Sequence, residues 1–299
     1  MTGATGFVGR HILKKLMEQG HTVKCLVRPD SAPRLPQSPQ VMAIPGNIHD
    51  PSTFESALGG SDGVIHLVGI ISEVGENTFY RVHTRGAMNL VDAMCRQGVR
   101  RLVHMSALGT RPGANSQYHQ SKYDAEVYLC SHFLDFTVFR PSVIHGPDGE
   151  FTQLLKQFAT LPFFPVLGDG KGLLQPVYVE DVATVFVSAL TKPESVGRVY
   201  PLGGPKAYTI EAMVEVMARA MGRSPGRPMH IPLWLMNLQA AAMETIFPVL
   251  GQAPILNTDQ LVMAQEDNVC DSSEAQTLFG TPFVDFEEAV RRYMSRVSS

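Results

Sequence analysis

The sequence carries no excess of charge of either sign. Its 299 residues include 25 Lys and Arg against 28 Asp and Glu, a formal net charge of −3 at pH 7. Proteins that bind nucleic acid through their overall charge are strongly basic, so this balance gives no indication of a nucleic-acid partner. A small-molecule ligand is the default expectation that remains.

Cysteines are few, and their spacing does not suggest a disulfide framework. The chain has no Cys-x-x-Cys pair, and its four cysteines lie far apart: Cys25, Cys95, Cys130 and Cys270. No secretory apolar segment precedes them. We therefore expect reduced core cysteines and a cytoplasmic location.

Long apolar runs are also missing. The longest apolar stretch, residues 233–250, is interrupted by Asn237, Gln239, Glu244 and Pro248. It falls short of the ~20 uninterrupted residues that a membrane-spanning helix needs. We predict no transmembrane segment, which leaves peripheral membrane association open.

The very start of the chain has three closely spaced glycines. Gly3, Gly6 and Gly9 precede a stretch, residues 10–20, whose apolar side chains recur at helical spacing. A dinucleotide pyrophosphate sits against backbone N–H groups at a helix N-terminus, where side chains at the closest positions would block it. This pattern predicts a dinucleotide-binding turn.

One part of that pattern is missing, because only Met1 and Thr2 precede Gly3 and a strand needs about five residues. In a doubly wound fold this strand lies in the middle of the sheet, and its loss would leave backbone groups of the neighbouring strands unpaired. We therefore expect the natural chain to carry about five to eight more residues upstream that form the strand.

Strand-like and helix-like segments alternate through the first half. The expected strands are residues 22–27, 41–44, 63–67, 101–105 and 136–139, and the expected helices are 51–58, 79–97 and 121–133. Such alternation predicts an α/β fold, a doubly wound parallel sheet of the Rossmann type with helices on both faces.

The end of the second expected strand bears on the choice of cofactor. An acidic residue there binds the free 2′-hydroxyl of NAD, whereas an Arg accommodates the 2′-phosphate of NADP. This chain has Arg28 at that position, which favours NADP, with Arg10 as a second contact. Alternatively, Arg28 is a solvated loop cation, and Asp30 can still reach a ribose.

A serine, a tyrosine and a lysine form the second informative group. Ser106 ends a strand, and Tyr118 and Lys122 are four residues apart, hence on one face of a helix. An ammonium near a phenol stabilises the phenolate, so Lys122 can make Tyr118 a usable acid or base, while Ser106 hydrogen-bonds the substrate oxygen. Taken alone, a Tyr-x-x-x-Lys pair on a helix is more often a surface pair than a catalytic one, and it is the combination with the glycine turn and Ser106 that favours catalysis.

Together these motifs resemble a known superfamily. Residues 2–9, Ser106 with residues 118–122, and residues 140–147 resemble the extended or atypical branch of the short-chain dehydrogenase/reductase superfamily. Residues 64–71, 175–183 and 256–260 with 267–269 are similar to a narrower group, the bacterial relatives of the dehydrogenase-like accessory subunit of respiratory complex I.

The resemblance implies a nucleotide-binding domain, a smaller C-terminal α/β substrate lobe, and a tightly held NADP(H) whose catalytic use it leaves open. By position, Ser106, Tyr118 and Lys122 match the family's catalytic triad. With the residues argued above, the implied cofactor site comprises Gly3, Thr5, Gly6, Phe7, Val8, Gly9, Arg10, Arg28, Asn47, Ile48, Leu67, Val68, Gly69, His83, Tyr118, Lys122, Pro141, Ser142, Val143 and Ile144.

Two positions depart from the family pattern. Asn47 replaces an acidic residue near the adenine; it can hydrogen-bond but has no charge. His83 stands where extended members often carry an Asn of a proton relay, and it either relays a proton or fills space. The other histidines, including His66, His104, His119 and His145, lack metal-ligand spacing, so we predict no metal.

We expect two domains: a dinucleotide-binding domain, residues 1–147 and 175–202, and a substrate lobe, residues 148–174 and 203–299. Residues 229–250 are rich in Met, Leu and Ala and include Trp234, which suits either core or an apolar pocket. If they form a pocket, the substrate is a hydrophobic carbonyl compound or a quinone.

Three functions remain open from the sequence. The first is an NADP-dependent oxidoreductase that uses Tyr118. The second is a non-catalytic NADP(H)-binding module, structural or redox-sensing, in a homodimer or a larger assembly. The third is an NAD-dependent nucleotide-sugar epimerase or dehydratase, against which Arg28 argues.

Overall fold

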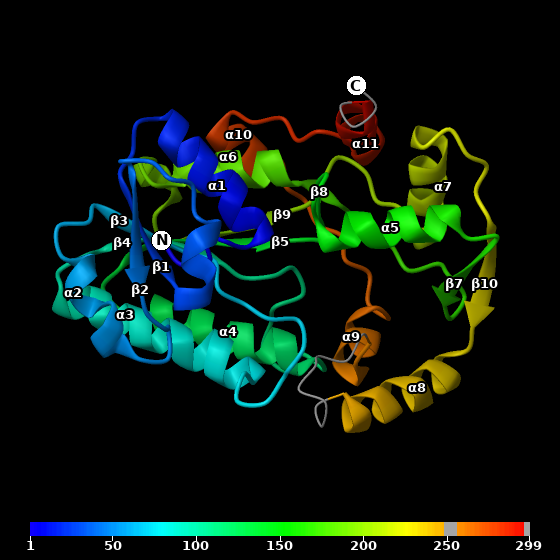
Figure 1. Ribbon diagram of the computed structural model, residues 1–299, viewed down its shortest axis with the longest axis horizontal. Helices are drawn as coiled ribbons and strands as arrows, with labels where there is room; N and C mark the ends of the chain where they lie inside the picture. The colour runs from blue at the N-terminus through cyan, green and yellow to red at the C-terminus, as the bar shows by residue number, and fades with distance from the viewer. Residues whose placement is uncertain (248–255, 296–299) are drawn as a thin grey trace.

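The computed structural model describes residues 1–247 and 256–295 and shows a parallel sheet with helices on both faces (Figure 1). The main strands are β1 (Val23–Val27), β2 (Val41–Pro45), β3 (Gly63–His66), β4 (Arg101–Met105), β5 (Asp135–Pro141) and β9 (Arg198–Leu202). Strands β3-β4-β5-β9 form one set of neighbours and β1-β2 another, and every pairing is parallel. The predicted doubly wound α/β fold is therefore confirmed.

Met1 and Thr2 lie between the two sets of strands. Thr2 forms parallel bridges to Leu26 of β1 and His66 of β3, and the Leu26 N–H donates to the Met1 carbonyl over 2.9 Å. Beyond Met1, a cavity of about 600 Å³ separates β1 from β3. The strand expected before the glycine turn stays a prediction.

Alternating side chains of the strands supply the cores of both faces. On β4, Leu102 packs with α3 and α4, whereas Val103 packs with α1 and α6. One face is covered by α1 (Phe7–Glu18), α6 (Val179–Ala189) and α10 (Ser273–Phe279), and the other by α2 (Glu55–Leu58), α3 (Gly86–Arg96) and α4 (Gln117–Cys130). Short helical turns η1 (Pro29–Arg34), η2 (Pro51–Thr53), η3 (Tyr80–Arg85) and η4 (Pro193–Ser195) connect these elements.

The remaining elements lie beside this sheet. They are α5 (Glu150–Thr160), β7 (Phe163–Leu167), α7 (Ile210–Ala220), β10 (Arg227–Ile231), α8 (Leu233–Ile246), α9 (Thr258–Met263) and α11 (Phe286–Ser295). Four of them, α5, β7, α7 and α11, share a second core. The short strands β6 (Ile144–His145) and β8 (Val177–Tyr178) pair in parallel between the two parts. Within residues 203–299, α10 returns to the first core through Ala275 and Phe279. The division at residue 147 stays a prediction.

Two helices begin earlier than the sequence patterns predict, and a third expected helix is divided. The helix expected over residues 121–133 begins at Gln117, because the Ser116 side chain accepts a hydrogen bond from the His119 N–H and so caps it. The helix expected from Arg10 begins at Phe7, inside the glycine motif. The segment 79–97 divides into a wide π-helical turn, η3, and α3.

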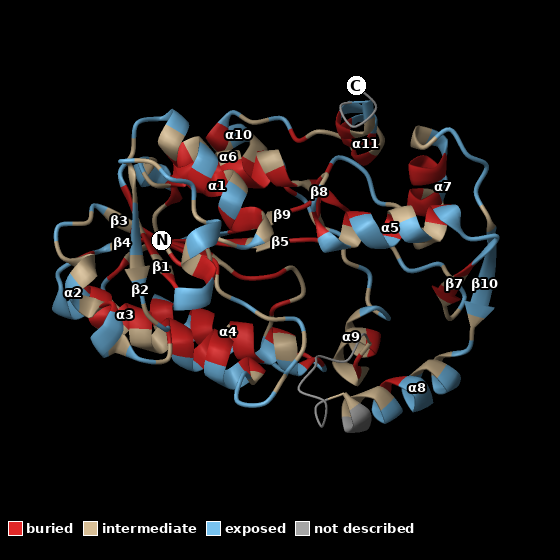
Figure 2. Ribbon diagram, viewed as in Figure 1, coloured by how far each residue is buried: buried red, intermediate tan, exposed pale blue. Residues whose placement is uncertain are grey.

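The apolar stretch of residues 229–250 is not core in its described part. Trp234 is 69% exposed and Leu238 64% exposed, and Figure 2 shows α8 largely in the exposed colours. Residues 248–250 of the stretch lie outside the described residues.

In the described part of the chain, no helix combines the length and apolar character needed to cross a bilayer.

Candidate functional site

The glycine turn has the backbone geometry that a pyrophosphate site needs. Gly3 adopts φ +73°, which favours glycine, and a Cβ on Gly9 would lie 2.0 Å from the Gly3 carbonyl oxygen. Gly6 is the N-cap of α1 and makes no side-chain cap, and the first turn of α1 holds no acidic residue. The N–H groups at this helix end therefore stay available for an anion.

Two of the neighbouring predicted cofactor residues, Val8 and Phe7, pack into the fold. Val8 is buried in the core beside α6. The Phe7 ring lies against the segment after β6, where a Cβ on Gly149 would lie 2.8 Å from it. Thr5 lies in the turn itself, before Gly6. Phe7 thus packs the start of α1 against the segment that precedes α5.

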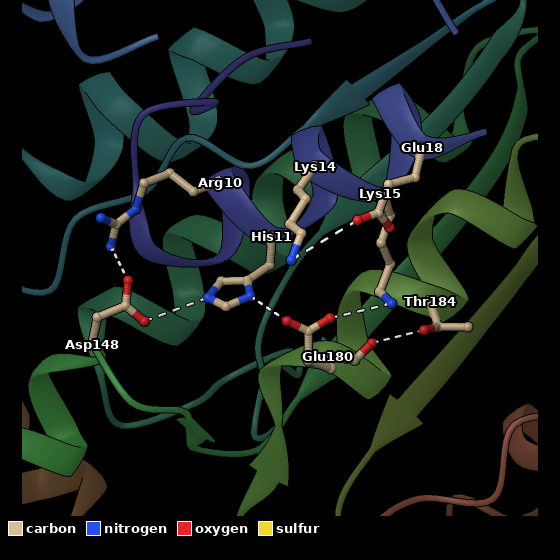
Figure 3. Close-up of polar contacts among 8 residues, drawn as sticks. All are labelled: Arg10, His11, Lys14, Lys15, Glu18, Asp148, Glu180 and Thr184. Carbon is tan, nitrogen blue, oxygen red and sulfur yellow. Dashed lines mark hydrogen bonds and ion pairs between the residues drawn. The ribbon is translucent and has the colours of Figure 1, made fainter. Parts of the chain in front are cut away.

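The two predicted arginine contacts differ in their surroundings. Arg10 forms an ion pair of 2.7 Å with Asp148, in the network of α1, α6 and the segment before α5 that Figure 3 shows. In the same network, His11 Nδ1 lies 2.6 Å from a Glu180 carboxylate oxygen. Arg28 is exposed at the end of β1, and it forms no ion pair with any residue that the structure describes. Among the described residues, Arg10 therefore has an ion-pair partner and Arg28 has none.

The predicted adenine contacts lie on the loop after β2. The Asn47 side-chain oxygen accepts a hydrogen bond of 3.1 Å from the His49 N–H, which leaves its amide N–H₂ exposed. Ile48 is buried, and its carbonyl accepts a hydrogen bond from the side chain of Asn89. Asn47 can thus donate to a base without changing its local turn.

The loop after β3 lies against both the glycine turn and the lysine. A Cβ on Gly3 would lie 3.1 Å from the Leu67 side chain. A Cβ on Gly69 would lie 3.4 Å from His83 Nε2 and 3.5 Å from the Lys122 ammonium. Val68, between them, is half-buried beside the core of the α3 and α4 face. A side chain at position 69 would therefore compete for the space in front of Lys122.

Lys122 and Tyr118 lie together at the carboxyl ends of β3 and β4. The Lys122 ammonium donates to the Met105 carbonyl over 3.3 Å and lies 5.5 Å from the centre of the Tyr118 ring. Ser106 follows Met105 directly, and its Oγ donates a hydrogen bond of 3.3 Å to Thr110. Lys122 has no ion pair within the described residues, so its other N–H groups remain available to a ligand.

Burial shifts the pKa values of both titratable groups. It lowers the pKa of Lys122 to about 8, although the Glu126 carboxylate opposes the shift. Burial raises the pKa of Tyr118 above its ordinary value, and the negative charge of Asp259 raises it further. Without a ligand, Tyr118 is therefore a protonated phenol at neutral pH.

His83 links the loop after β3 to the helix that carries Tyr118. Its Nε2 accepts a hydrogen bond of 3.0 Å from the Ile70 N–H, so the neutral ring donates from Nδ1 to Ser121 Oγ over 2.9 Å. Ser121 Oγ in turn donates to the Tyr118 carbonyl. Burial, with Lys122 nearby, lowers the pKa of His83 to about 2, so the ring stays neutral. Both ring nitrogens are engaged, which makes His83 a structural bridge.

The segment after β5 is hydrogen-bonded to three separate parts of the chain. The Pro141 carbonyl accepts from the Leu108 N–H, and Ser142 Oγ donates to the Asn268 carbonyl over 3.2 Å. The Val143 carbonyl accepts from the Val177 N–H, and Ile144 begins β6. The predicted nicotinamide segment thus occupies a fixed position beside β9.

The structure adds two site residues that we did not predict from the sequence. Asp259 of α9 accepts hydrogen bonds of 2.7 Å from the Gln117 N–H and 2.7 Å from Ser116 Oγ, at the N-terminus of α4. Asn257 donates to the Ile71 carbonyl and to Ser72 in the loop after β3. Asn257 and Gln260 form a capping box that the sequence pattern could have indicated. The site partners of Asn257 and Asp259, however, are more than 140 residues away in the chain, so no local pattern indicates them.

His66, His104 and His145 are buried. His66 and His104 stack with ring centres 5.2 Å apart on paired strands, and burial lowers the pKa of His66 to about 3. His145 is buried among aromatic rings. Among residues 1–247 and 256–295, no group of three or more His, Cys, Asp or Glu side chains is placed to hold a metal ion.

Comparisons with known proteins agree with this architecture. The NAD(P)H-binding family matches residues 3–193. The chain is 28% identical over 272 residues to mitochondrial NADH dehydrogenase (ubiquinone) 1 alpha subcomplex subunit 9 of Arabidopsis thaliana, an alignment that covers 87% of this chain and 67% of the relative. It is 30% identical over 194 residues to a ceramide reductase of Caulobacter vibrioides, covering 64% of this chain and 61% of the relative.

Solved structures share the fold at low identity. The UDP-glucuronic acid 4-epimerase of Bacillus cereus, in complex with UDP-glucuronic acid and NAD, superposes with a TM-score of 0.73 at 20% identity over 99% of this chain and 98% of the epimerase. The chain therefore belongs to the NAD(P)H-binding family, and it is similar in sequence to a complex I subunit.

Proposed function

We propose that this protein is an NADP-dependent oxidoreductase that reduces a hydrophobic carbonyl compound or quinone, with Tyr118 as the proton donor. The observation that carries the proposal is the position of the Lys122 ammonium. It lies beneath the Tyr118 ring, between Gly69 and Met105, with N–H groups available to a ligand. A buried lysine without a carboxylate partner is costly to keep for structure alone.

The residues present fit a dinucleotide, so their roles can be assigned. The N–H groups of the turn at Gly6 would hold the pyrophosphate, and Lys122 would donate to ribose hydroxyls. When bound, the nicotinamide supplies a hydride to the substrate carbon. Ser106 Oγ would hydrogen-bond the substrate oxygen, and Tyr118 would give that oxygen its phenolic proton.

The pKa values favour reduction over oxidation. Burial and Asp259 keep the Tyr118 phenol protonated, which suits a proton donor. After the transfer, the Lys122 ammonium, whose pKa burial lowers to about 8, can return a proton to the phenolate; it lies 5.5 Å from the centre of the Tyr118 ring. Lys122 would thus both hold the ribose and restore Tyr118.

We propose NADP rather than NAD as the cofactor because of Arg28. It is exposed at the end of β1, where a 2′-phosphate would lie, and has no carboxylate partner among the described residues. We do not assign the 2′-phosphate to Arg10, since its guanidinium already pairs with Asp148.

We propose that the substrate binds where the dinucleotide-binding domain, residues 1–147 and 175–202, meets the lobe of residues 148–174 and 203–299. A hydrophobic or lipid-like substrate is supported by the 30% identity to a ceramide reductase.

Replacing Tyr118 by Phe tests the proposal. The variant should lose turnover of NADPH with a panel of hydrophobic carbonyls and short-chain quinones, while its affinity for NADPH stays within about threefold, because only the phenolic oxygen is removed. Tyr123→Phe, on the same helix, is the matched control and should keep full turnover. Turnover that survives in Tyr118→Phe would exclude Tyr118 as proton donor.

A second candidate function is a non-catalytic NADP(H)-binding module within an assembly. The similarity to a complex I subunit over 87% of this chain favours it. It predicts bound nucleotide, as seen by native mass spectrometry, without NADPH oxidation by any substrate of the panel. An NAD-dependent nucleotide-sugar epimerase, as among the structural neighbours, would retain NAD instead.

A further inference from the structure

We infer that α8 is a docking helix for an anionic lipid surface. The helix is apolar on nearly every side, yet it lies on the outside of the protein (Figure 2). A helix that is hydrophobic all round is normally buried. Here Trp234, Leu235 and Leu238 are 69%, 42% and 64% exposed.

The attachment of α8 determines which side is left open. Ala240 is fully buried, and Glu244 accepts hydrogen bonds of 2.7 Å and 2.8 Å from the N–H and Oγ of Thr258. At 100° per residue, Trp234, Leu235 and Leu238 lie about 140° to 240° around the helix from Ala240. These three side chains therefore form one apolar face that points away from the protein.

The segment before α8 adds positive charge. Between Glu215 and Glu244 the sequence has no acidic residue. Arg223 and Arg227 are exposed, and neither forms an ion pair with a residue in the described ranges. They line an open hollow of about 550 Å³ together with Phe163. A phosphate headgroup would meet two uncompensated guanidinium groups there.

The combination favours a lipid surface over a protein partner. Figure 1 shows β10 leading directly from this basic segment into α8, and Met229 of β10 is 51% exposed. Unpaired arginines, an exposed tryptophan at the start of a helix, and an apolar face that extends about 6 Å along the helix axis from Trp234 to Leu238 are what an interfacial membrane helix presents. Acidic headgroups supply the complementary charge.

The location of this surface matters for the site. Through Glu244 and Thr258, α8 is joined to α9, whose Asp259 and Asn257 hold α4 and the loop after β3. A protein docked by α8 would therefore hold its candidate site beside the lipid. The inference nevertheless stands apart from the proposed function, because docking requires neither nucleotide nor turnover.

Vesicle binding tests the inference without any cofactor. Trp234 is the only tryptophan, so its emission reports directly on this face. We expect a blue shift and co-sedimentation with vesicles of phosphatidylcholine and phosphatidylglycerol. Binding to phosphatidylcholine alone should be weaker, and raised salt should weaken binding to the mixed vesicles. Tyr118→Phe should bind equally well, which separates this result from the fate of the proposed reaction.

Variants make the test specific. Leu235→Glu with Leu238→Glu should abolish co-sedimentation, and Arg223→Glu with Arg227→Glu should reduce partitioning at least about tenfold. Phe133→Glu is the matched control, because Phe133 is 95% exposed beyond the end of α4 and should leave binding unchanged. Circular dichroism confirms that each variant is folded.

Three outcomes would overturn the inference. The first is vesicle binding that persists in the double Leu variant. The second is the absence of vesicle binding in a monomeric protein. The third is a dimer, measured by light scattering, that binds no vesicles and dissociates in the double Leu variant, since the face would then be an interface between two copies of this chain.

Discussion

Asp259 offers the sharpest test of how the C-terminal segment supports the candidate site. Its carboxylate accepts hydrogen bonds from the Gln117 N–H, from Ser116 Oγ and, over 3.2 Å, from the Tyr118 N–H. All three donors belong to the start of α4, the helix of Tyr118 and Lys122. Replacing Asp259 by Asn removes the charge, keeps one acceptor oxygen, and turns an N–H₂ group toward backbone N–H donors.

The size of the effect follows from these contacts. A hydrogen bond to a charged group contributes about 1.5–3 kcal/mol, and a negative charge at a helix N-terminus adds about 0.3–1 kcal/mol. Asp259 is half-buried, so solvent screens part of this, and we expect a net loss of about 2 kcal/mol. For a chain of this length, that loss lowers Tm by about 3 °C.

The effect on the site should exceed the effect on stability. Because the charge of Asp259 raises the pKa of Tyr118, the Asn variant should bring that pKa down. Loss of the tie between α9 and α4 should also displace Tyr118, and a displaced catalytic group costs about 100-fold in turnover. NADPH affinity should change little, since Asp259 lies away from the glycine turn.

Calorimetry and NADPH-oxidation kinetics measure these two quantities on the same preparation. Asp271→Asn is the matched control: Asp271 is exposed and caps only the Ser273 N–H, a role in which Asn serves equally well. The reasoning fails if Asp259→Asn and Asp271→Asn melt at the same temperature, because the carboxylate would then not stabilise α4.

Three further predictions use the same protein. Arg28→Asp should weaken NADP binding about ten- to 100-fold and leave NAD binding no weaker, as measured by fluorescence titration, and equal NADP affinity would remove the argument for NADP. The Kd for NADPH should rise as pH passes about 8, where Lys122 loses its proton, and Lys122→Met should abolish this inflection. Glu180, bound by His11 and Lys15, has its pKa lowered from 4.5 to about 2, so its stabilisation is full above pH 4.5 and lost toward pH 2. Glu180→Gln should therefore cost about 1–2 kcal/mol in urea unfolding at pH 7 and less at pH 3, and an equal cost at both pH values would contradict this.

Local patterns predicted the strands well because each strand is a short apolar run between turn residues. Residues 101–105 were predicted as a strand and form β4 with the same bounds. Helix starts were predicted less well. The start of α4 depends on the Ser116 cap and on Asp259, and the second of these lies on an element that reaches α4 only in the folded chain.

The candidate site shows the same contrast between what local sequence patterns predict and what depends on the folded chain. The residue types and spacing of Ser106, Tyr118 and Lys122 indicated a family, and family membership is confirmed by the match over residues 3–193. Their catalytic roles stay predictions. From the sequence, His83 is either a proton relay or a space filler, and only the folded chain shows that its ring is hydrogen-bonded to Ile70 and Ser121.

The sequence by itself determined the nucleotide-binding turn and the parallel architecture, because glycine clearance and apolar periodicity are local properties of the chain. Only the tertiary structure decided the electrostatic state of the site: burial, Glu126 and Asp259 determine the pKa values of Lys122 and Tyr118. It also decided that α8 is exposed rather than core. An apolar helix looks the same in sequence whether or not a neighbour covers it, and burial depends on what the rest of the chain places beside it.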